Sequence, residues 1–309
     1  MTSRHRLLAS FVVIVAAAAT TPVWGQTGRS ANAANGPAAR VASRQAAPAP
    51  AAPARPFPPL GAAAQMQLQS TLKQWEQQSQ GTKTLQANFT RWHYDPAGSP
   101  DPKQHARRSD GILKYARPDR GVFRVDKLVF FAGMENGQPV YRDQPNQFGE
   151  YWVCTGDSLI EMDRTAKECK IQDLPPHMRG VGIIDSPLPF VFNLDAAKIQ
   201  QRYWVRQVGA PEGIVLIEAW PKSQSDRGQY KLVQIALDAK TFLPKALIMY
   251  APNFHPTNAP VWDHYEFKDV KRNSIGAGLQ QFVSSFIPGK PPKNWKVSRD
   301  DFLKRTASP

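Results

Sequence analysis

Residues 151–171 read YWVCTGDSLIEMDRTAKECKI, which is three short apolar segments separated by two turn signals. The turn signals are Thr155-Gly156-Asp157 and Arg164-Thr165-Ala166. Short segments rich in apolar and aromatic residues, joined by tight turns, are typical of an antiparallel meander. The stretch therefore predicts strands over 151–154, 158–162 and 168–171.

The same signals continue on both sides of this meander. Further strands are expected over 84–93, 111–115, 122–131, 203–207, 213–220, 231–237, 246–250 and 263–270. Helices are expected over 65–80, where Leu68, Leu72 and Trp75 share one face, and over 194–201. About ten antiparallel strands predict an α+β fold, in which a single strongly curved antiparallel sheet, an incomplete β-barrel, is covered by two or three helices.

The meander separates the two cysteines. With the turns placed as above, Cys154 lies opposite Leu159 and Cys169 lies opposite Met162, so one strand stands between the thiols. Strands two apart are separated by about 9–10 Å, whereas a disulfide needs Cα atoms within about 7 Å. We therefore predict that the two thiols are not bridged to each other, although a bridge is the default in an oxidising compartment.

The N-terminal fifth differs in composition from the rest. Arg4, His5 and Arg6 precede an apolar run, residues 7–19, and residues 23–25 suit cleavage before Gln26. We expect a signal peptide over 1–25, an Ala/Pro-rich disordered linker over 26–64, the folded domain over 65–300 and a polar tail over 301–309. The mature chain is then periplasmic or secreted and soluble; an uncleaved N-terminal anchor is the alternative.

The positive charge is spread along the chain. There are 39 Lys+Arg against 25 Asp+Glu, a formal net charge of +14, and the basic clusters 103–108 and 290–296 are short. A nucleic-acid interface would gather Lys and Arg into one stripe with interleaved aromatics. We expect no nucleic-acid partner, whereas an anionic membrane surface or lipid stays a candidate.

Sequence motifs for catalysis are missing. The chain has no Gly-x-Ser-x-Gly, His-Glu-x-x-His, P-loop or Rossmann pattern. The best metal candidates are His255, Asp263, His264 and Glu266, but strand alternation sends Asp263 to one face and His264 and Glu266 to the other. We expect a non-enzymatic protein without a metal or cofactor; an enzyme built around His264 or Cys154 is the least favoured hypothesis.

Apolar side chains recur at alternate positions of the predicted strands. Ten of them are expected to line one face of the sheet as candidate ligand contacts: Leu113, Tyr115, Phe123, Val125, Val233, Ile235, Leu237, Ile248, Tyr265 and Phe267. They either fill a core under the helices, at about 1.5–3 kcal/mol of burial each, or line a hollow that accepts a hydrophobic ligand.

Five short stretches occur in an order found in one protein family. They are LQANFT (85–90), GILKYARP (111–118) with FRV (123–125), TGDSLIEMD (155–163), SPLPFVF (186–192), and IP (287–288) with PPKNWKV (291–297). Together they resemble the LolA-like superfamily of outer-membrane lipoprotein carriers over about residues 66–300. The leader resembles that of an uncharacterised secreted planctomycete branch. This resemblance implies a strongly bent antiparallel sheet closed by helices.

The resemblance also implies one functional residue. In the carriers the arginine of the Arg-Pro motif is a latch that hydrogen bonds to the lid, and Arg117 matches it. The other interpretation of Arg117 is a strand-end cation before Pro118. The chain departs from the family in a long Gly/Pro/Asn insertion at 131–149 and in the polar Glu161, which replaces an aromatic residue.

Two functional hypotheses follow. The leading one is an exported, monomeric carrier or binding protein that holds a lipid or a lipoprotein acyl chain in the hydrophobic concavity of the half-barrel. The alternative is a periplasmic sensor or interaction module of the same fold that binds a membrane-protein partner, with the insertion 131–149 and the Ala/Pro tether as its sequence hints.

Overall fold

One sheet of thirteen strands dominates the computed structural model, which describes residues 54–145, 149–174, 194–273 and 279–300. The strands are β1 (Thr84–Tyr94), β2 (Arg107–Ala116), β3 (Arg120–Glu135), β4 (Gln138–Asp143), β5 (Glu150–Thr155), β6 (Ser158–Asp163), β7 (Glu168–Asp173), β8 (Tyr203–Val208), β9 (Ile214–Pro221), β10 (Leu232–Asp238), β11 (Pro244–Tyr250), β12 (Trp262–Arg272) and β13 (Lys296–Asp300). They follow one another in the order β13-β7-β6-β5-β3-β2-β1-β12-β11-β10-β9-β8, and β4 pairs with β3 off this path.

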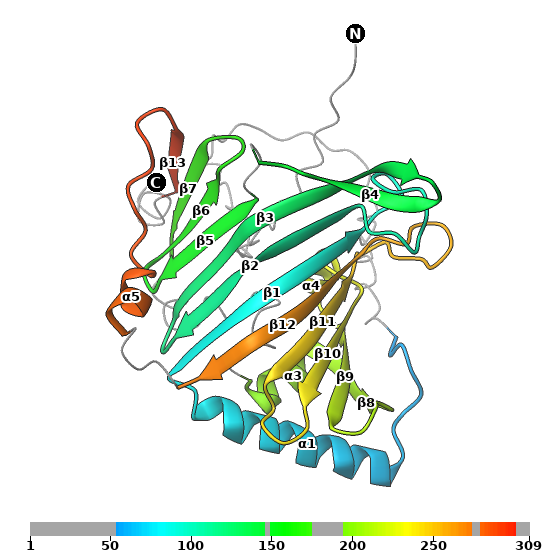
Figure 1. Cartoon of the computed structure of the whole chain (residues 1–309). Helices are drawn as coiled ribbons and strands as arrows, with labels where there is room; N and C mark the ends of the chain where they lie inside the picture. The colour runs from blue at the N-terminus through cyan, green and yellow to red at the C-terminus, as the bar shows by residue number, and fades with distance from the viewer. Residues whose placement is uncertain (1–53, 146–148, 175–193, 274–278, 301–309) are drawn as a thin grey trace, which may run out of the picture. The chain divides into compact units, whose positions relative to one another are not determined.

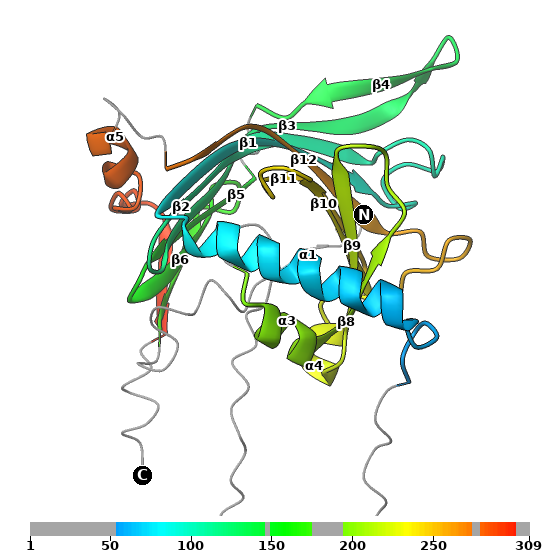
Figure 2. The same ribbon diagram turned by 90° about the horizontal axis from the view of Figure 1, so that it is seen from below.

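The sheet is curved and open. Its end strands, β8 and β13, do not pair with each other, and every pairing between the described strands is antiparallel except that of β13 with β7. The curvature is visible in Figures 1 and 2. The predicted α+β fold with one strongly curved, incompletely closed antiparallel sheet is confirmed.

Helix α1 (Ala62–Gln80) runs along the open side of the sheet (Figure 2). It contains neither Gly nor Pro, and Leu68, Leu72 and Trp75 are buried at the spacing of one helix face. It packs on β8 and on α3 (Ala196–Arg202), and Thr71 Oγ1 donates to Gln207 of β8 at 2.8 Å. None of the described helices is both long enough and apolar enough to cross a membrane.

We call the face that carries Leu85, Ala87 and Phe89 of β1 the inner face, and the opposite face the outer face. Helix α5 (Leu279–Ser284) covers part of the outer face. Phe282 of this helix and Phe286, which follows it, form a buried cluster with Val122 of β3 and Val153 of β5. The sequence prediction missed α5, the one-turn helix α4 (Gln224–Arg227), β4 and β13.

Within the predicted insertion 131–149, residues 131–135 complete β3 and Gln138–Asp143 form β4. Asn136 and Gly137 both have positive φ, at 51° and 75°, as a two-residue hairpin turn requires. The Asn-Gly pair is a strong hairpin signal, which the sequence prediction did not use.

The cysteine prediction is confirmed. Cys154 is the partner of Leu159 and Cys169 is the partner of Met162, with β6 between the two. Both thiols are free and buried.

The predicted signal peptide, residues 26–53 of the linker, the 186–192 stretch and the polar tail lie outside the described residues. The described residues from Pro56 onward belong to one compact unit. Within it Phe57 is buried and its ring lies 5.2 Å from that of Trp220, so packing begins upstream of α1.

Candidate functional site

Strand β1 carries an apolar and a polar segment on the same face. Its inner positions are Leu85, Ala87 and Phe89 and then, toward the β3–β4 hairpin, Arg91 and His93. Leu85 is 1% exposed, Arg91 is 4% exposed, and the His93 side chain is 15% exposed. The inner face therefore changes along its strands from buried and apolar to polar and solvent-reaching.

The apolar segment contains nine of the ten predicted ligand contacts. Each of these nine is between 0% and 7% exposed: Leu113, Tyr115, Phe123, Val125, Val233, Ile235, Leu237, Tyr265 and Phe267. Their rings and aliphatic side chains pack across strands, as in the stack of Phe89 on Phe123 with centroids 4.7 Å apart. The inner face is therefore covered in this structure, and a role of these residues in ligand binding stays a prediction.

Ile248 lies on the outer face, not with the other nine. The register places it opposite Gln234 and His264, whereas its neighbours Leu247 and Met249 are buried on the inner face. The run Ala246 to Tyr250 is apolar at both parities, so alternation alone gave no way to choose the inward set. The expectation that Ile248 faces inward is corrected.

Arg117, the predicted latch, lies exposed at the turn between β2 and β3. Its backbone N–H donates to the carbonyl of Lys83 at 2.8 Å. The resemblance does not assign the lid to particular residues of this chain, so the latch role stays a prediction.

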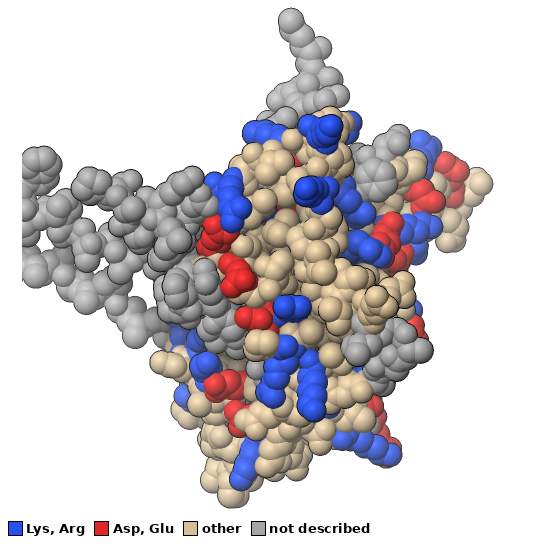
Figure 3. Space-filling model, turned by 90° about the vertical axis from the view of Figure 1, so that its left-hand side faces the viewer, with Lys and Arg blue, Asp and Glu red and all other residues tan. Residues whose placement is uncertain are grey.

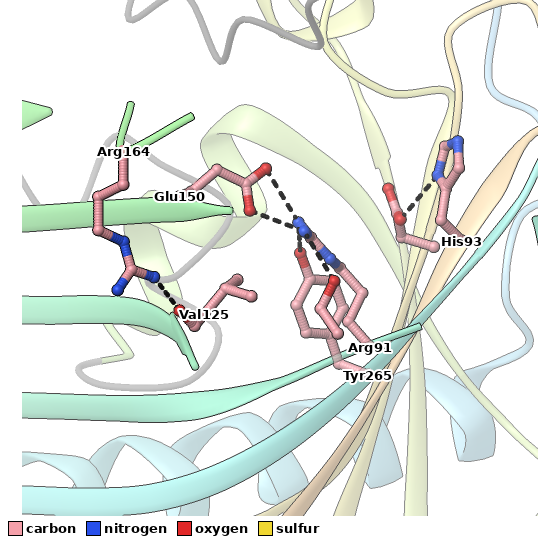
Figure 4. Close-up of polar contacts among 8 residues, drawn as sticks. Arg91, His93, Val125, Glu150, Arg164 and Tyr265 are labelled. Carbon is pink, nitrogen blue, oxygen red and sulfur yellow. Dashed lines mark hydrogen bonds and ion pairs between the residues drawn. The ribbon is translucent and has the colours of Figure 1, made fainter. Parts of the chain in front are cut away.

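Arg91 is the centre of a buried polar cluster (Figure 4). It donates to both carboxylate oxygens of Glu150, at 2.7 Å and 3.3 Å, and to the hydroxyls of Tyr265 at 3.3 Å and Ser109 at 3.4 Å. Its guanidinium carbon lies 6.0 Å from the Phe123 ring centroid and 5.7 Å from that of Tyr265. The apolar part of the inner face thus ends at the Arg91–Glu150 ion pair, and the guanidinium of Arg91 also lies against the aromatic rings of Phe123 and Tyr265.

The pKa values of this cluster favour its charged form. Burial alone would neutralise both partners, but Glu150 raises the pKa of Arg91 well above its ordinary value. Burial likewise opposes the charge of Glu150, yet Arg91, with help from Arg107, holds the pKa of Glu150 below its ordinary value. Burial raises the pKa of Tyr265 to about 12, so its hydroxyl keeps its proton at neutral pH.

The next row of the inner face holds Asp263, His93 and Arg107, which the register places side by side on β12, β1 and β2. His93 Nδ1 lies 2.9 Å from Asp263 Oδ1. Burial opposes the charge of Asp263, but the hydrogen bond to His93 and nearby arginines bring its pKa below the ordinary value. Arg107 has a buried Nε without a partner, and among the described residues its guanidinium forms no hydrogen bond or ion pair.

Within the described residues, no group of three or more His, Cys, Asp or Glu side chains is arranged to hold a metal ion. Asp263 faces inward, while His264 and Glu266 face outward opposite Trp92 and Thr90, as alternation predicted. Burial raises the pKa of Cys154 to about 11, which makes its thiol a poor nucleophile at neutral pH.

At the β13 end of the sheet, basic side chains of β13 form ion pairs with acidic side chains of β7. Lys296 lies 3.3 Å from Glu168, and Arg299 lies 3.0 Å from Asp173. On this side of the molecule Lys and Arg are interspersed with Asp and Glu (Figure 3). Such a surface is unlike the single basic stripe of a nucleic-acid interface.

The sequence prediction missed the polar end of the inner face. A signal for Arg91 and His93 was present, because the alternation of Leu85, Ala87 and Phe89 continues directly into them. Glu150 had no comparable signal, since its contact with Arg91 depends on the packing of β5 beyond β2 and β3.

No protein-family model and no curated protein matches the sequence. Solved structures with a similar arrangement include an uncharacterized conserved protein from Thermus thermophilus, with 11% identity, a TM-score of 0.39, and coverage of 75% of this chain and 99% of that one. A MucA/MucB complex from Pseudomonas aeruginosa gives 14% identity and a TM-score of 0.35 over 68% of this chain and 59% of that one. A putative outer membrane lipoprotein-sorting protein domain from Vibrio parahaemolyticus gives 9% identity and a TM-score of 0.32 over 71% and 98%. Likeness at these identities says nothing about the ligands or partners of this chain.

Proposed function

We propose that the chain is an exported, monomeric, non-enzymatic binding protein of the LolA-like superfamily, in its secreted planctomycete branch, which holds a lipid or a lipoprotein acyl chain against the inner face. The observation that carries this proposal is the continuous apolar surface on the inner side of an unclosed sheet. Because β8 and β13 do not pair, helices and not strands cover this side, and a helix can move away without breaking a β-ladder.

Burial sets the energetic condition for binding. The nine inner apolar residues are covered in this structure, so a ligand enters only as the cover of the inner face moves. An acyl chain gains about 0.8 kcal/mol per buried methylene. About ten methylenes then supply about 8 kcal/mol, which can offset the lost helix packing and the ordering of the chain.

Two tryptophans on opposite faces provide the test. Trp152 lies opposite Phe123 on the inner side, with ring centroids 5.4 Å apart, and Trp92 lies on the outer side beside His264. A fatty acid brominated along its chain should quench the tryptophan fluorescence of the native protein. The quenching should decrease in Trp152→Phe and remain in the matched control Trp92→Phe.

Native mass spectrometry of protein purified from an exporting host should also show co-purified lipid. A bare mass combined with no quenching would refute the proposal, and quenching that depends on Trp92 alone would place the lipid on the wrong face. N-terminal sequencing of the exported protein should begin at Gln26 if the signal peptide is cleaved as expected.

A second candidate function is the binding of a membrane-protein partner, and the β3–β4 hairpin is the observation that favours it. The hairpin projects from the sheet (Figure 2), and Met134 near its tip is 52% exposed. A large exposed apolar side chain on a projecting hairpin suits a protein contact. Pull-down of one membrane protein that is lost when residues 131–143 are replaced by a short turn would support this function, and unchanged recovery would reject it.

A further inference from the structure

We propose that the polar end of the inner face is a head-group site, and that the ligand is an amphiphile whose acyl chain carries an anionic carboxylate or phosphate group. This inference rests on the proposed function and specifies the ligand class. The site consists of Arg107 and His93, with Arg142 at its rim.

The first step is the unpaired charge of Arg107. Alternation puts Arg107 on the inner face with Ser109, Gly111 and Leu113, while its neighbour Arg108 faces outward and lies 3.5 Å from Asp110. The Arg107 Nε is buried without a partner, and the described residues offer its guanidinium no ion pair. Five other arginines also have a buried Nε without a partner, namely Arg91, Arg108, Arg164, Arg227 and Arg272, but each of them makes another contact. Among the described residues, Arg107 is the one of these six whose whole guanidinium lacks a partner, so it can accept one from outside.

The second step is the charge balance around Arg107. Glu150 is already held by Arg91 at 2.7 Å, and Asp263 is already held by His93 at 2.9 Å. Both carboxylates are therefore engaged, although the charge of Arg107 acts on each of them. Arg107 is therefore the cation of this row that neither carboxylate holds by a hydrogen bond, which favours an anionic partner from outside.

The third step is a second cation in the same row. The register places Arg107 opposite Phe130, and Phe130 opposite Arg142, so the two arginines lie on one face with a single strand between them. Their backbones are then about 10 Å apart. Two flexible guanidiniums at this spacing can donate to the same carboxylate or phosphate, and Phe130 can contact the first methylenes below it.

The fourth step is the exposure along the strands. Phe89 and Leu113 are 2% and 1% exposed, whereas the Asp263 and Glu150 side chains are 22% and 24% exposed. The polar end is thus the end that reaches water. An amphiphile bound in this orientation buries its chain against the apolar rows and keeps its charged group at the surface.

The remaining charged groups near this row have other neighbours. His93 Nε2 lies 3.8 Å from Asp95 Oδ2. Lys127 lies 3.3 Å from Asp143, and Arg124 is paired with Asp126. Arg107 therefore remains the inner-face cation that an anionic ligand can satisfy.

The test compares ligands that share one chain. Palmitate, cetyl alcohol and cetyl phosphate compete against a fluorescent fatty acid for the full-length mature protein at fixed ionic strength. A charge-assisted hydrogen bond should favour the anions over the alcohol by about tenfold to a hundredfold. The ratio between palmitate and cetyl phosphate distinguishes a carboxylate from a phosphate head group.

Adjacent arginines provide the matched variants. Arg107→Gln should reduce the preference for the anions at least tenfold in ratio while the affinity for cetyl alcohol stays within about twofold. Arg108→Gln, one residue away on the outer face, should keep the full preference. Arg107→Lys keeps the positive charge but removes the planar guanidinium, so it should keep part of the preference for the anions. If Arg107→Gln fails to fold, Arg142→Gln on the exposed hairpin gives the same reading and should lower the preference.

Each outcome decides the inference. Equal binding of the three ligands by the native protein overturns the head-group site but leaves the proposed function standing. A preference that survives Arg107→Gln, or one that Arg108→Gln lowers as much, also overturns it. If none of the three ligands binds, the proposed function and the head-group site both fail.

Discussion

The Arg91→Met variant should have a much lower free energy of unfolding than the native protein, and the loss should exceed that caused by replacing an exposed arginine. The variant keeps most of the side-chain volume but removes the charge that meets Glu150 at 2.7 Å and the donors to Tyr265 and Ser109. Removal of one partner of a buried ion pair costs about 3–5 kcal/mol, because the other charge is left without compensation. Since the Glu150 side chain is 24% exposed and regains some water, we expect about 3 kcal/mol.

The assay is urea unfolding of the native and variant proteins at neutral pH. Arg124→Met is the control, because its pair with Asp126 has side chains 40% and 43% exposed and should contribute less than about 1 kcal/mol. The double variant Arg91→Met/Glu150→Met should recover most of the loss, since a pair replaced by apolar residues is close to neutral. A loss below about 1 kcal/mol in Arg91→Met, or no recovery in the double variant, would refute the reasoning.

Three further predictions concern acid, backbone space and thiols. The lowered pKa of Glu150 makes its contribution complete above about pH 4 and lost as the pH falls through the folded-state pKa, so urea unfolding should become easier there, and less so in Glu150→Gln. Gly111→Ala should lower the free energy of unfolding by about 2 kcal/mol or more, because its Cβ would lie 2.0 Å from a carbonyl oxygen of β3. In the control Gly209→Ala the added Cβ meets no atom within 4 Å, so the same urea titration should show a change of less than about 0.5 kcal/mol. Cys154 and Cys169 should react with a thiol reagent only after unfolding and should give two labels per chain; a single label or none after unfolding would contradict the free-thiol assignment.

Local patterns were sufficient for eleven of the thirteen strands. They also gave the inward-facing residues of a strand wherever only one set of alternate positions is apolar. In β10 the alternation of Val233, Ile235 and Leu237 leaves no choice, and all three are buried. In β11 both parities are apolar, and the inward set became visible only through pairing with β10. Long-range pairing also explains the missed β13, because residues 296–300 are polar except for Val297 and become a strand only through parallel pairing with β7.

The candidate site was predicted only for its apolar half. Arg91 and Arg107 stand at inward positions of strands that were correctly found, yet an arginine at such a position is assigned to solvent unless its partner is known. Its partner Glu150 comes from a strand 59 residues later in the chain. Long-range contacts of this kind depend on the curvature of the whole sheet, which no local pattern contains.

The Arg91–Glu150 pair crosses the inner side from β1 to β5, with β2 and β3 between them. Three strand spacings amount to about 14 Å along a flat sheet. The two side chains can meet across that span because the sheet curves, so the contact depends on the curvature. Because Glu150 neutralises Arg91, an anionic ligand gains little there and must find its counter-charge at Arg107 in the next row. Stability and head-group selection then depend on different arginines. Arg91→Met should lower the free energy of unfolding, whereas Arg107→Gln should lower the ratio of anion to alcohol binding with a much smaller effect on unfolding. The double variant Arg91→Met/Glu150→Met, which leaves no unpaired carboxylate beside Arg107, should keep that ratio. Loss of the ratio in the double variant would show that the two arginines act as one site and would contradict this division.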